Sequence, residues 1–132
     1  MPQQAGVSHI ALTVTDAARS AAWYQKVLEG QPFFQGDDEH GHLEINLHGN
    51  LLLGFRTHPG TGKKDRFDPA RVGLDHLSIA CESAAELEKW RARLDENGVT
   101  HSGIQESPWG LHLNMRDPDD IQIELFVAPQ QG

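Results

Sequence analysis

Gly6-Val7-Ser8-His9-Ile10 returns later in the chain as Gly73-Leu74-Asp75-His76-Leu77, and this repeat is the strongest indication of how the protein folds. The glycine and the histidine are identical in the two copies, and an apolar residue follows each histidine. The same alignment, extended without a gap, brings Trp23 over Trp90. Internal similarity of this kind indicates a duplicated structural unit. We therefore interpret the chain as two homologous modules.

The modules are expected at residues 6–57 and 73–128, with a linker at 58–72, and together they form a single domain over 6–128. The linker is rich in Gly, Pro and charged residues, which is typical of a connection rather than of a helix or strand. With a shift of three residues, the end of the first module also aligns with the end of the second. This alignment places Gly54 over Glu124.

Each module is predicted to contain a strand, a helix and three further strands. The strands are expected at 7–14, 31–35, 42–48, 51–57, 74–81, 99–103, 111–116 and 121–127, and the helices at 17–28 and 84–96. Apolar residues alternate in the strands, and Asp16 and Ser83 stand where helix caps are favoured. Gly30 and Gly98 follow the helices, where a left-handed residue ends a helix. The predicted fold class is α+β: two βαβββ modules whose strands form a curved, mostly antiparallel sheet around a metal cleft.

Composition restricts the class of partner. The chain has 132 residues, 38% of them hydrophobic and 23% charged, as in an ordinary globular domain. Its net charge of −8 disfavours nucleic acid and anionic membranes, because both are bound mainly by cationic residues. It has no apolar run of about 20 residues and no signal-peptide pattern, so we expect a cytoplasmic protein. A small molecule is the expected partner.

Two histidines and a glutamate are the candidate metal ligands. In 121–127 the odd positions are apolar, which leaves Glu124 on the opposite face of its strand. His9 and His76 also lie opposite the apolar side of their strands. If the modules pair about a pseudo-twofold axis, all three donors share one concave surface. Two imidazoles and a carboxylate suit Fe(II), Mn(II), Zn(II) or a similar ion and leave positions open for substrate.

A second set of polar residues lies on strand 42–48, where they alternate with leucine and isoleucine. The set is His42, Glu44, Asn46 and His48. Alternation puts all four on one face of the strand. They either line the same concave surface as the metal ligands, as substrate-pocket residues, or meet solvent.

The pattern resembles the vicinal oxygen chelate superfamily, which includes glyoxalases, extradiol dioxygenases, fosfomycin-resistance thiol transferases and bleomycin-binding proteins. The resemblance is carried by 7–12, Trp23-Tyr24, Val27-Leu28, 74–77, 116–120 and 123–125. It covers about residues 6–128 and implies a glyoxalase-like fold with a divalent metal, which is Fe(II), Mn(II), Zn(II) or Ni(II) in such proteins. It also implies a homodimer, with the modules paired within one chain or across two.

The resemblance also bears on the reaction. Glyoxalases use a fourth protein ligand, a glutamate at the position of Gly54, so a four-ligand site is disfavoured. Fosfomycin enzymes clamp a phosphonate with cationic residues, and residues 103–110 contain none. A dioxygenase-like or lyase-like enzyme on a small oxygenated metabolite is therefore favoured. The alternatives are a metal-free binding protein of the bleomycin-resistance type and a fosfomycin-type thiol transferase.

His112 is the candidate acid or base, because a histidine carries protons near neutral pH and its strand face is expected to point to the cleft. Asn114 lies on the same face of that strand and is a further candidate for the substrate pocket. The alternative for His112 is that it only forms a wall of the pocket.

Overall fold

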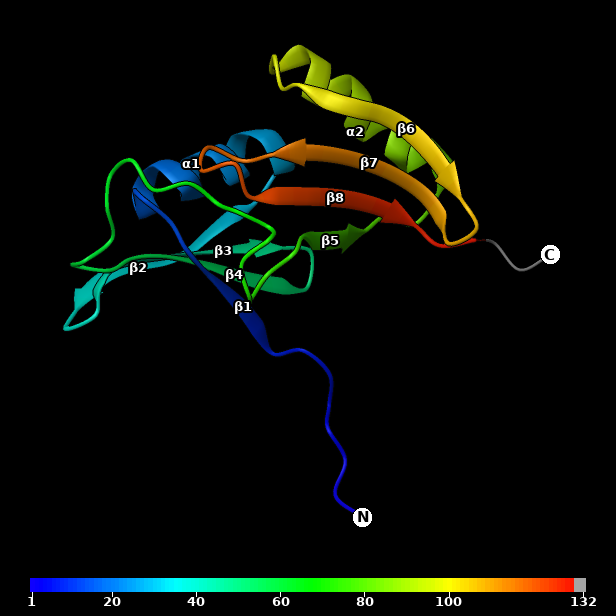
Figure 1. The fold of residues 1–132 in the computed structure, drawn as a ribbon. Helices are drawn as coiled ribbons and strands as arrows, with labels where there is room; N and C mark the ends of the chain where they lie inside the picture. The colour runs from blue at the N-terminus through cyan, green and yellow to red at the C-terminus, as the bar shows by residue number, and fades with distance from the viewer. Residues whose placement is uncertain (130–132) are drawn as a thin grey trace. The chain divides into compact units, whose positions relative to one another are not determined.

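The chain folds as a strand, a helix and three strands, and then repeats that order (Figure 1). The computed structural model describes residues 1–129. The first set is β1 (His9–Thr13), α1 (Ala17–Leu28), β2 (Gln31–Asp38), β3 (Gly41–His48) and β4 (Leu51–Thr57). The second set is β5 (Leu77–Ala80), α2 (Ala84–Glu96), β6 (His101–Ser107), β7 (Gly110–Arg116) and β8 (Gln122–Val127). The βαβββ order predicted for both modules is confirmed.

The described residues divide into two compact units, with the boundary between Asp65 and Arg66. Each unit has its own four-stranded sheet, in the order β1-β4-β3-β2 and β5-β8-β7-β6. The first and last strands of a unit run parallel, because the helix carries the chain across the sheet between β1 or β5 and the strands that follow. The other neighbours are antiparallel. The α+β class is confirmed, but the strands make two mixed four-stranded sheets rather than a single eight-stranded one.

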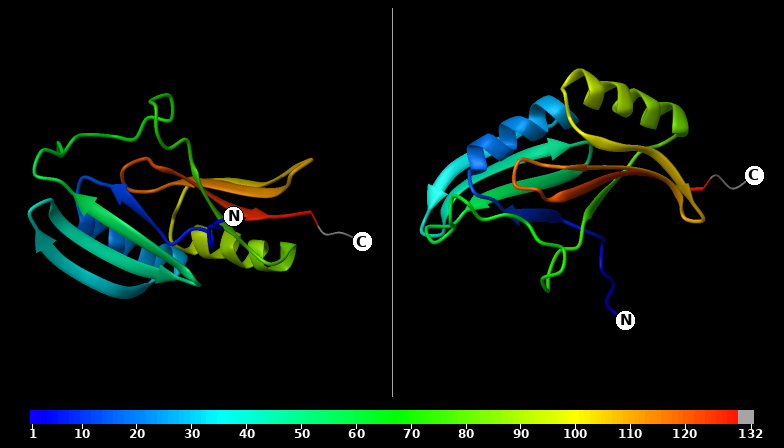
Figure 2. Two further views of the ribbon diagram at one scale, coloured as in Figure 1. Left: turned by 90° about the horizontal axis from the view of Figure 1, so that it is seen from below. Right: turned by 45° about the horizontal axis from the view of Figure 1, so that its top comes forward.

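In each unit the helix lies along one side of the sheet (Figure 2). We call this side the helix face and the other side the far face. The residues at 1% exposure or less are mostly apolar and belong to the helices or to the helix faces of the sheets. They include Tyr24, Leu53 and Phe55 in the first unit, and Leu87, Leu113 and Ile123 in the second. The far faces are therefore the ones free to carry polar side chains.

Helix α1 begins at its predicted cap, since the Asp16 side chain accepts a hydrogen bond from the Arg19 amide at 3.1 Å. Its end differs from the prediction. Glu29, rather than Gly30, takes the left-handed conformation, with φ 57°. Gly30 is required for space instead, because a Cβ there would lie 2.4 Å from atoms of the His48 ring.

Helix α2 matches its prediction at both ends. The Ser83 side chain accepts from the Glu86 amide at 3.1 Å. Gly98 has φ +67°, the left-handed conformation in which a glycine is favoured. Leu87 and Leu94 lie on the same side of the helix and are both buried in the core of the second unit.

Four strand predictions need correction. The strand expected at 7–14 is β1 at His9–Thr13, which is shorter at both ends. The strand expected at 99–103 is β6 at His101–Ser107, because it continues into a tight hairpin that pairs Ser107 with Gly110. β2 extends beyond residue 35 to Asp38, and its register shifts between Pro32 and Phe34. The strand expected at 74–81 is shorter, so His76 lies immediately before β5. Within residues 1–129, no helix is long and apolar enough to cross a membrane.

Candidate metal centre

Glu124 lies on the far face of the second sheet, as alternation predicted. Its neighbours Ile123 and Leu125 are buried on the helix face, at 1% and 2% exposure. The register places Ser78 of β5 on one side of Glu124 and Asn114 of β7 on the other. The prediction that Asn114 shares this face is confirmed, whereas its role in a pocket stays a prediction.

Both carboxylate oxygens of Glu124 have protein donors. The Ser78 hydroxyl donates to Oε1 at 2.8 Å, and Nδ1 of His112 lies 3.0 Å from Oε2. An ionised carboxylate only accepts hydrogen bonds, so the proton in the second contact belongs to Nδ1 of His112. The side chains of Glu124 and His112 are only 13% and 18% exposed. The arrangement fixes the carboxylate in a largely dry setting.

The pKa of Glu124 is lowered from its ordinary value. Burial is the largest single influence and raises the pKa, but the hydrogen bonds from His112 and Ser78, with the charges of His112 and His76, together outweigh it. Glu124 is therefore ionised at neutral pH. Ionised carboxylate is the form that binds a divalent cation.

His112 is also held from its other side, because its Nε2 hydrogen-bonds the Ser107 hydroxyl. Its ring packs at 5.1 Å from the ring of Phe126, which is on the same face. Sequence reasoning missed Ser107 and Ser78. Ser78 could have been found, since it is two residues after His76 and so on the same face, but Ser107 depends on the position of the hairpin, which the sequence did not predict.

His76 lies beside this group, and its charge lowers the pKa of Glu124. Its Nδ1 is 2.7 Å from Oδ1 of Asp75, and its side chain is 45% exposed. In the neutral form of the ring, Asp75 accepts the Nδ1 proton, and Nε2 then has a lone pair directed away from Asp75. A carboxylate partner on the remote nitrogen is the usual support of a metal-binding histidine.

His9 has the equivalent arrangement in the first unit. It is exposed on the far face of β1, and its Nδ1 lies 2.9 Å from the hydroxyl of Ser8. In both repeats, therefore, the residue before the histidine contacts Nδ1. Nε2 of His9 has a free lone pair in the tautomer in which Ser8 accepts the Nδ1 proton. No group of three or more His, Cys, Asp or Glu residues that could hold a metal ion occurs within residues 1–129. The triad of His9, His76 and Glu124, which draws on both units, stays a prediction.

The chemistry of the three donors fits a divalent cation. Each oxygen of Glu124 accepts one protein hydrogen bond, and a carboxylate offers about four lone-pair sites, so capacity remains. The two imidazoles each have Nδ1 occupied by a neighbour. Neutral imidazole nitrogen and carboxylate oxygen are ordinary ligands of Zn(II), Mn(II) and Fe(II).

The polar residues of β3 do not share the face of His9, and their role in a substrate pocket stays a prediction. Asn46 is 1% exposed, donates to the Ala21 carbonyl of α1 at 3.0 Å and accepts from Gln25 at 2.9 Å. His48 packs its ring on that of Tyr24 in the same helix. Alternation showed that His42, Glu44, Asn46 and His48 share one face, but it did not show which. Here the amide of Asn46 satisfies its hydrogen bonds on the helix, so the polar set turns inwards and Leu43, Ile45 and Leu47 take the far face.

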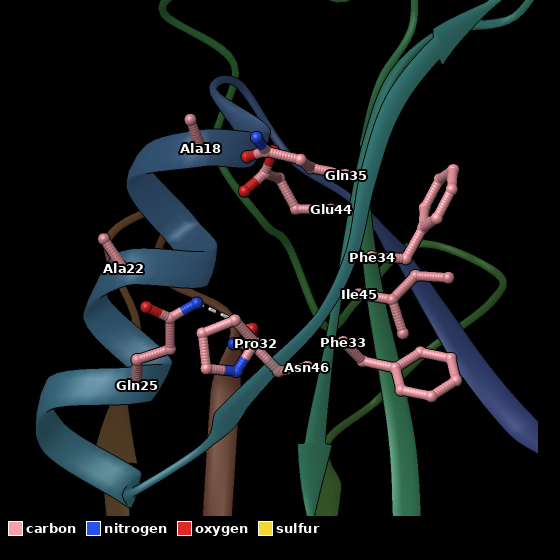
Figure 3. A pocket seen from close by; sticks show the side chains of 10 residues that line it. All are labelled: Ala18, Ala22, Gln25, Pro32, Phe33, Phe34, Gln35, Glu44, Ile45 and Asn46. Atoms are coloured by element: carbon pink, nitrogen blue, oxygen red, sulfur yellow. Dashed lines mark hydrogen bonds between the residues drawn. The ribbon is translucent and has the colours of Figure 1, made fainter.

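Two of these residues line a hollow of about 420 Å³ beside α1 (Figure 3). Glu44 and Gln35 lie at one end of the hollow, and the hydrogen-bonded pair of Gln25 and Asn46 at the other. His42 bridges Asp37 and Glu44 at 2.9 and 2.7 Å, and hydrogen bonds to these two carboxylates raise its pKa. This hollow is on the helix side of the first sheet, away from the face of His9.

Gly54 occupies the position of Glu124 in the first sheet. Ala11 is opposite Gly54 in the β1–β4 pair, as Ser78 is opposite Glu124 in the β5–β8 pair. The sequence alignment of Gly54 with Glu124 is therefore confirmed. A Cβ at Gly54 would meet its nearest atoms at 3.7 Å, an ordinary contact, so the glycine is not required for space.

Comparison with known proteins agrees with this fold. The family model for the Glyoxalase/Bleomycin resistance protein/Dioxygenase superfamily matches residues 6–125. A crystal structure of a glyoxylase/bleomycin resistance protein/dioxygenase domain from Frankia sp. EAN1pec is 35% identical, covers 96% of this chain and 100% of its own, and has a TM-score of 0.90.

Two more distant structures share the fold. A point mutant of the fosfomycin resistance protein FosX from Listeria monocytogenes, complexed with Mn(II) and 1S,2S-dihydroxypropylphosphonic acid, is 17% identical, with 96% and 95% of the two chains covered and a TM-score of 0.73. A lactoylglutathione lyase from Agrobacterium tumefaciens is 18% identical, with 96% of each chain covered and a TM-score of 0.74. With the family match over most of its length and the repeated βαβββ order, the chain belongs to the Glyoxalase/Bleomycin resistance protein/Dioxygenase superfamily.

Proposed function

We propose that the protein is a divalent-metal-dependent enzyme that chelates two neighbouring oxygens of a small metabolite, with His9, His76 and Glu124 as the metal ligands. The observation that carries this proposal is the state of Glu124: an ionised, nearly buried carboxylate on the far face, held by Ser78 and His112 and adjacent to His76. A carboxylate kept charged in a dry setting needs a reason, and cation binding supplies one.

The remaining donors support the same proposal. Asp75 accepts the Nδ1 proton of His76, and Ser8 is able to accept that of His9, an arrangement in which both Nε2 atoms serve as ligands. FosX, a protein of the same fold, has been crystallised with Mn(II). The three donors come from both units, so the proposal requires that they meet within one chain or between the chains of a homodimer.

When bound, the ion supplies a Lewis acid that polarises the substrate oxygens. The chain's own residues would orient the substrate and move its proton. His112 is placed for the second task, because its Nδ1 proton is held by Glu124 and its Nε2 can accept a proton from a neighbouring hydroxyl. We propose a dioxygenase-like or lyase-like reaction, since Gly54 takes the place of a fourth ligand and residues 103–110 have no cation for a phosphonate.

The test is activity with a defined metal. Protein loaded anaerobically with Fe(II) is assayed for oxygen uptake with a panel of catechols, and protein loaded with Mn(II), Ni(II) or Zn(II) is assayed with hemithioacetals of methylglyoxal and with an epoxide plus thiol. We expect turnover in the first or second assay, abolished by a chelator and restored by metal. Turnover only with epoxide and thiol would make the protein a thiol transferase instead.

A metal-free binding protein is the second candidate. The far face of the first sheet favours it, because Gly54 there is surrounded by Ala11, Leu43 and Ile45, which suit an apolar ligand and not a cation. Calorimetric binding of a small molecule that is unchanged by chelator, together with no turnover under any metal, would support this candidate and contradict the enzyme.

A further inference from the structure

Ser107, His112 and Glu124 form a continuous chain of hydrogen bonds within the second unit. Ser107 is the last residue of β6, and its hydroxyl bonds Nε2 of His112, while Nδ1 of the same ring bonds Oε2 of Glu124 at 3.0 Å. This series of hydrogen bonds is mostly shielded from solvent, because the side chains of His112 and Glu124 are only 18% and 13% exposed. It links the β6–β7 hairpin to the Glu124 carboxylate.

The direction of each hydrogen bond follows from the chemistry of the groups. A carboxylate only accepts hydrogen bonds, so in this contact His112 carries a proton on Nδ1. With that proton on Nδ1, Nε2 of a neutral ring is an acceptor. The Ser107 hydroxyl has two acceptors within reach, Nε2 of His112 and the Gly110 carbonyl at 3.5 Å, and it donates to Nε2 because that contact is much the shorter. The oxygen of Ser107 in turn accepts from the backbone amide of Trp109 at 3.1 Å. The Trp109 amide therefore donates to Ser107, Ser107 donates to His112, and His112 donates to Glu124, which only accepts.

The β6–β7 hairpin sets the position of these hydrogen bonds. Ser107 pairs with Gly110 in the register of β6 and β7, and the Trp109 amide points at the serine from the turn between them. The serine is thus fixed to backbone, and the imidazole is held between it and the ring of Phe126. A ring held at both nitrogens and along one side has one orientation available.

The first repeat has no counterpart of the His112 imidazole or of the Glu124 carboxylate in this hydrogen-bonded group. Leu43 occupies the position of His112 in the first sheet, because it pairs with Arg56 where His112 pairs with Phe126. Gly54 occupies the position of Glu124. The chain of hydrogen bonds is therefore a property of the second unit, where the carboxylate is, and is not a general requirement of the fold.

We propose that Ser107 is a positioning residue of the metal centre: by fixing the orientation of the His112 ring, it presents the Glu124 carboxylate to the cation. This inference rests on the proposed function for the identity of the ligand Glu124. It assigns to Ser107 a role in metal affinity, with His112 as the intermediary. Outer residues that orient a metal ligand commonly change affinity by about 10–100-fold when removed.

The first test is Mn(II) affinity of the whole protein, measured by electron paramagnetic resonance or calorimetry. Ser107→Ala is expected to weaken binding by about tenfold or more. Ser107→Thr, which keeps the hydroxyl, is expected to restore most of that loss. The matched control is Ser102→Ala, because Ser102 is on the same strand and its hydroxyl makes hydrogen bonds only to the backbone of Gly103 and Asn114. This control should bind as the parent does.

The second test needs no metal. Long-range nitrogen–proton correlation spectra of the parent protein report which nitrogen of His112 is protonated, and we expect the Nδ1–H form. In Ser107→Ala the Nδ1–H form should persist, because Glu124 still accepts that proton, but the ring resonances of His112 should shift and broaden as the ring loses its fixed orientation. In Ser102→Ala they should not change.

The outcomes separate the two proposals. A parent protein that binds no Mn(II) overturns the proposed function and this inference with it. Binding by the parent that is equal in Ser107→Ala overturns the inference alone. The Nε2–H tautomer in the parent also overturns the inference, even if Ser107→Ala does not fold.

Discussion

In the first sheet Leu53 of β4 lies beside Ile10 of β1, and in the second sheet Ile123 of β8 lies beside Leu77 of β5 in the same register. Leu53 and Ile123 are both fully buried against the helix of their unit, at 0% and 1% exposure. On the helix face, therefore, the two repeats keep the same kind of residue at the same place. This is the face on which burial of apolar surface stabilises each unit.

One residue further along, the repeats differ completely. The far-face positions hold Ala11, Leu43, Ile45 and Gly54 in the first sheet, and Ser78, His112, Asn114 and Glu124 in the second. Every apolar or absent side chain of the first set is replaced by a polar one in the second. A strand can diverge in this way because its two faces are independent: one face supports packing, and the other is free for chemistry.

The largest effect on stability is expected from breaking the shared helix faces. Leu53→Ala should lower the free energy of unfolding by about 2–5 kcal/mol, because it leaves a cavity at a fully buried site. Ile123→Ala should cost a similar amount in the second unit. Urea titration followed by circular dichroism measures both. A loss below about 1 kcal/mol in either variant would contradict the equivalence of the two positions.

A second comparison lies on the same face, where Asn46 and Met115 occupy equivalent positions opposite Leu53 and Ile123. Asn46→Ala should destabilise the protein by about 1–3 kcal/mol, since it removes a buried amide that bonds Ala21 and Gln25. The control Gln25→Ala removes only the more exposed partner and should cost less. Equal losses would show that the buried amide has no special role. Both are measured by thermal unfolding.

Gly30 and Gly98, which follow the two helices, are expected to be required for different reasons: lack of space at Gly30 and a left-handed backbone at Gly98. Gly30→Ala should cost about 1–3 kcal/mol, because its Cβ would overlap the His48 ring, and most of that cost should vanish in a His48→Ala background. Gly98→Ala should cost about 1–2 kcal/mol from backbone strain at φ +67°. Among the described residues, no atom lies close enough to a Cβ at Gly98 for a steric cost to be relieved. Additive effects of Gly30→Ala and His48→Ala on the free energy of unfolding would refute the steric explanation.

The smallest effect is a pH dependence from His48. Burial lowers the pKa of this ring, whose Nε2 has no hydrogen-bond partner among the described residues. The folded pKa is below the unfolded value of about 6.5, so the unfolded chain takes up the proton first. Stability from this residue is therefore present above about pH 6.5 and declines as the pH falls towards the folded pKa. His48→Phe should remove that decline, measured by unfolding at a series of pH values on both sides of neutrality.

The helices and the order of the strands were predicted well from the sequence, because each helix-cap and strand pattern occurs in both modules. Both helix caps and the face of Glu124 followed from local patterns that the structure confirms. The errors arose where tertiary contacts decide which face of a strand packs against the core. Strand β3 has alternating polar and apolar residues, so only the hydrogen bonds of Asn46 to α1 tell which set faces the core.

Only part of the candidate site could be predicted, again because local patterns do not reveal tertiary contacts. Glu124 and His112 follow from alternation within one strand each. Ser107 contacts His112 only because β6 continues to the hairpin, four residues beyond the predicted end of that strand. Hairpin register depends on the turn and on the bulge near Gly103, and neither has a strong local pattern.

The central claim is that the polar far face of the second sheet, with Glu124, makes this protein a metal binder. The direct measurement is metal content after equilibrium dialysis of the whole protein against Mn(II), for the parent, Glu124→Ala and Glu44→Ala. Glu44 is the matched control, since it is an equally shielded carboxylate bonded to a histidine, but on the helix face of the first sheet. We expect bound Mn(II) in the parent and in Glu44→Ala and none in Glu124→Ala. Metal retained in Glu124→Ala, or absent from the parent, would contradict the claim.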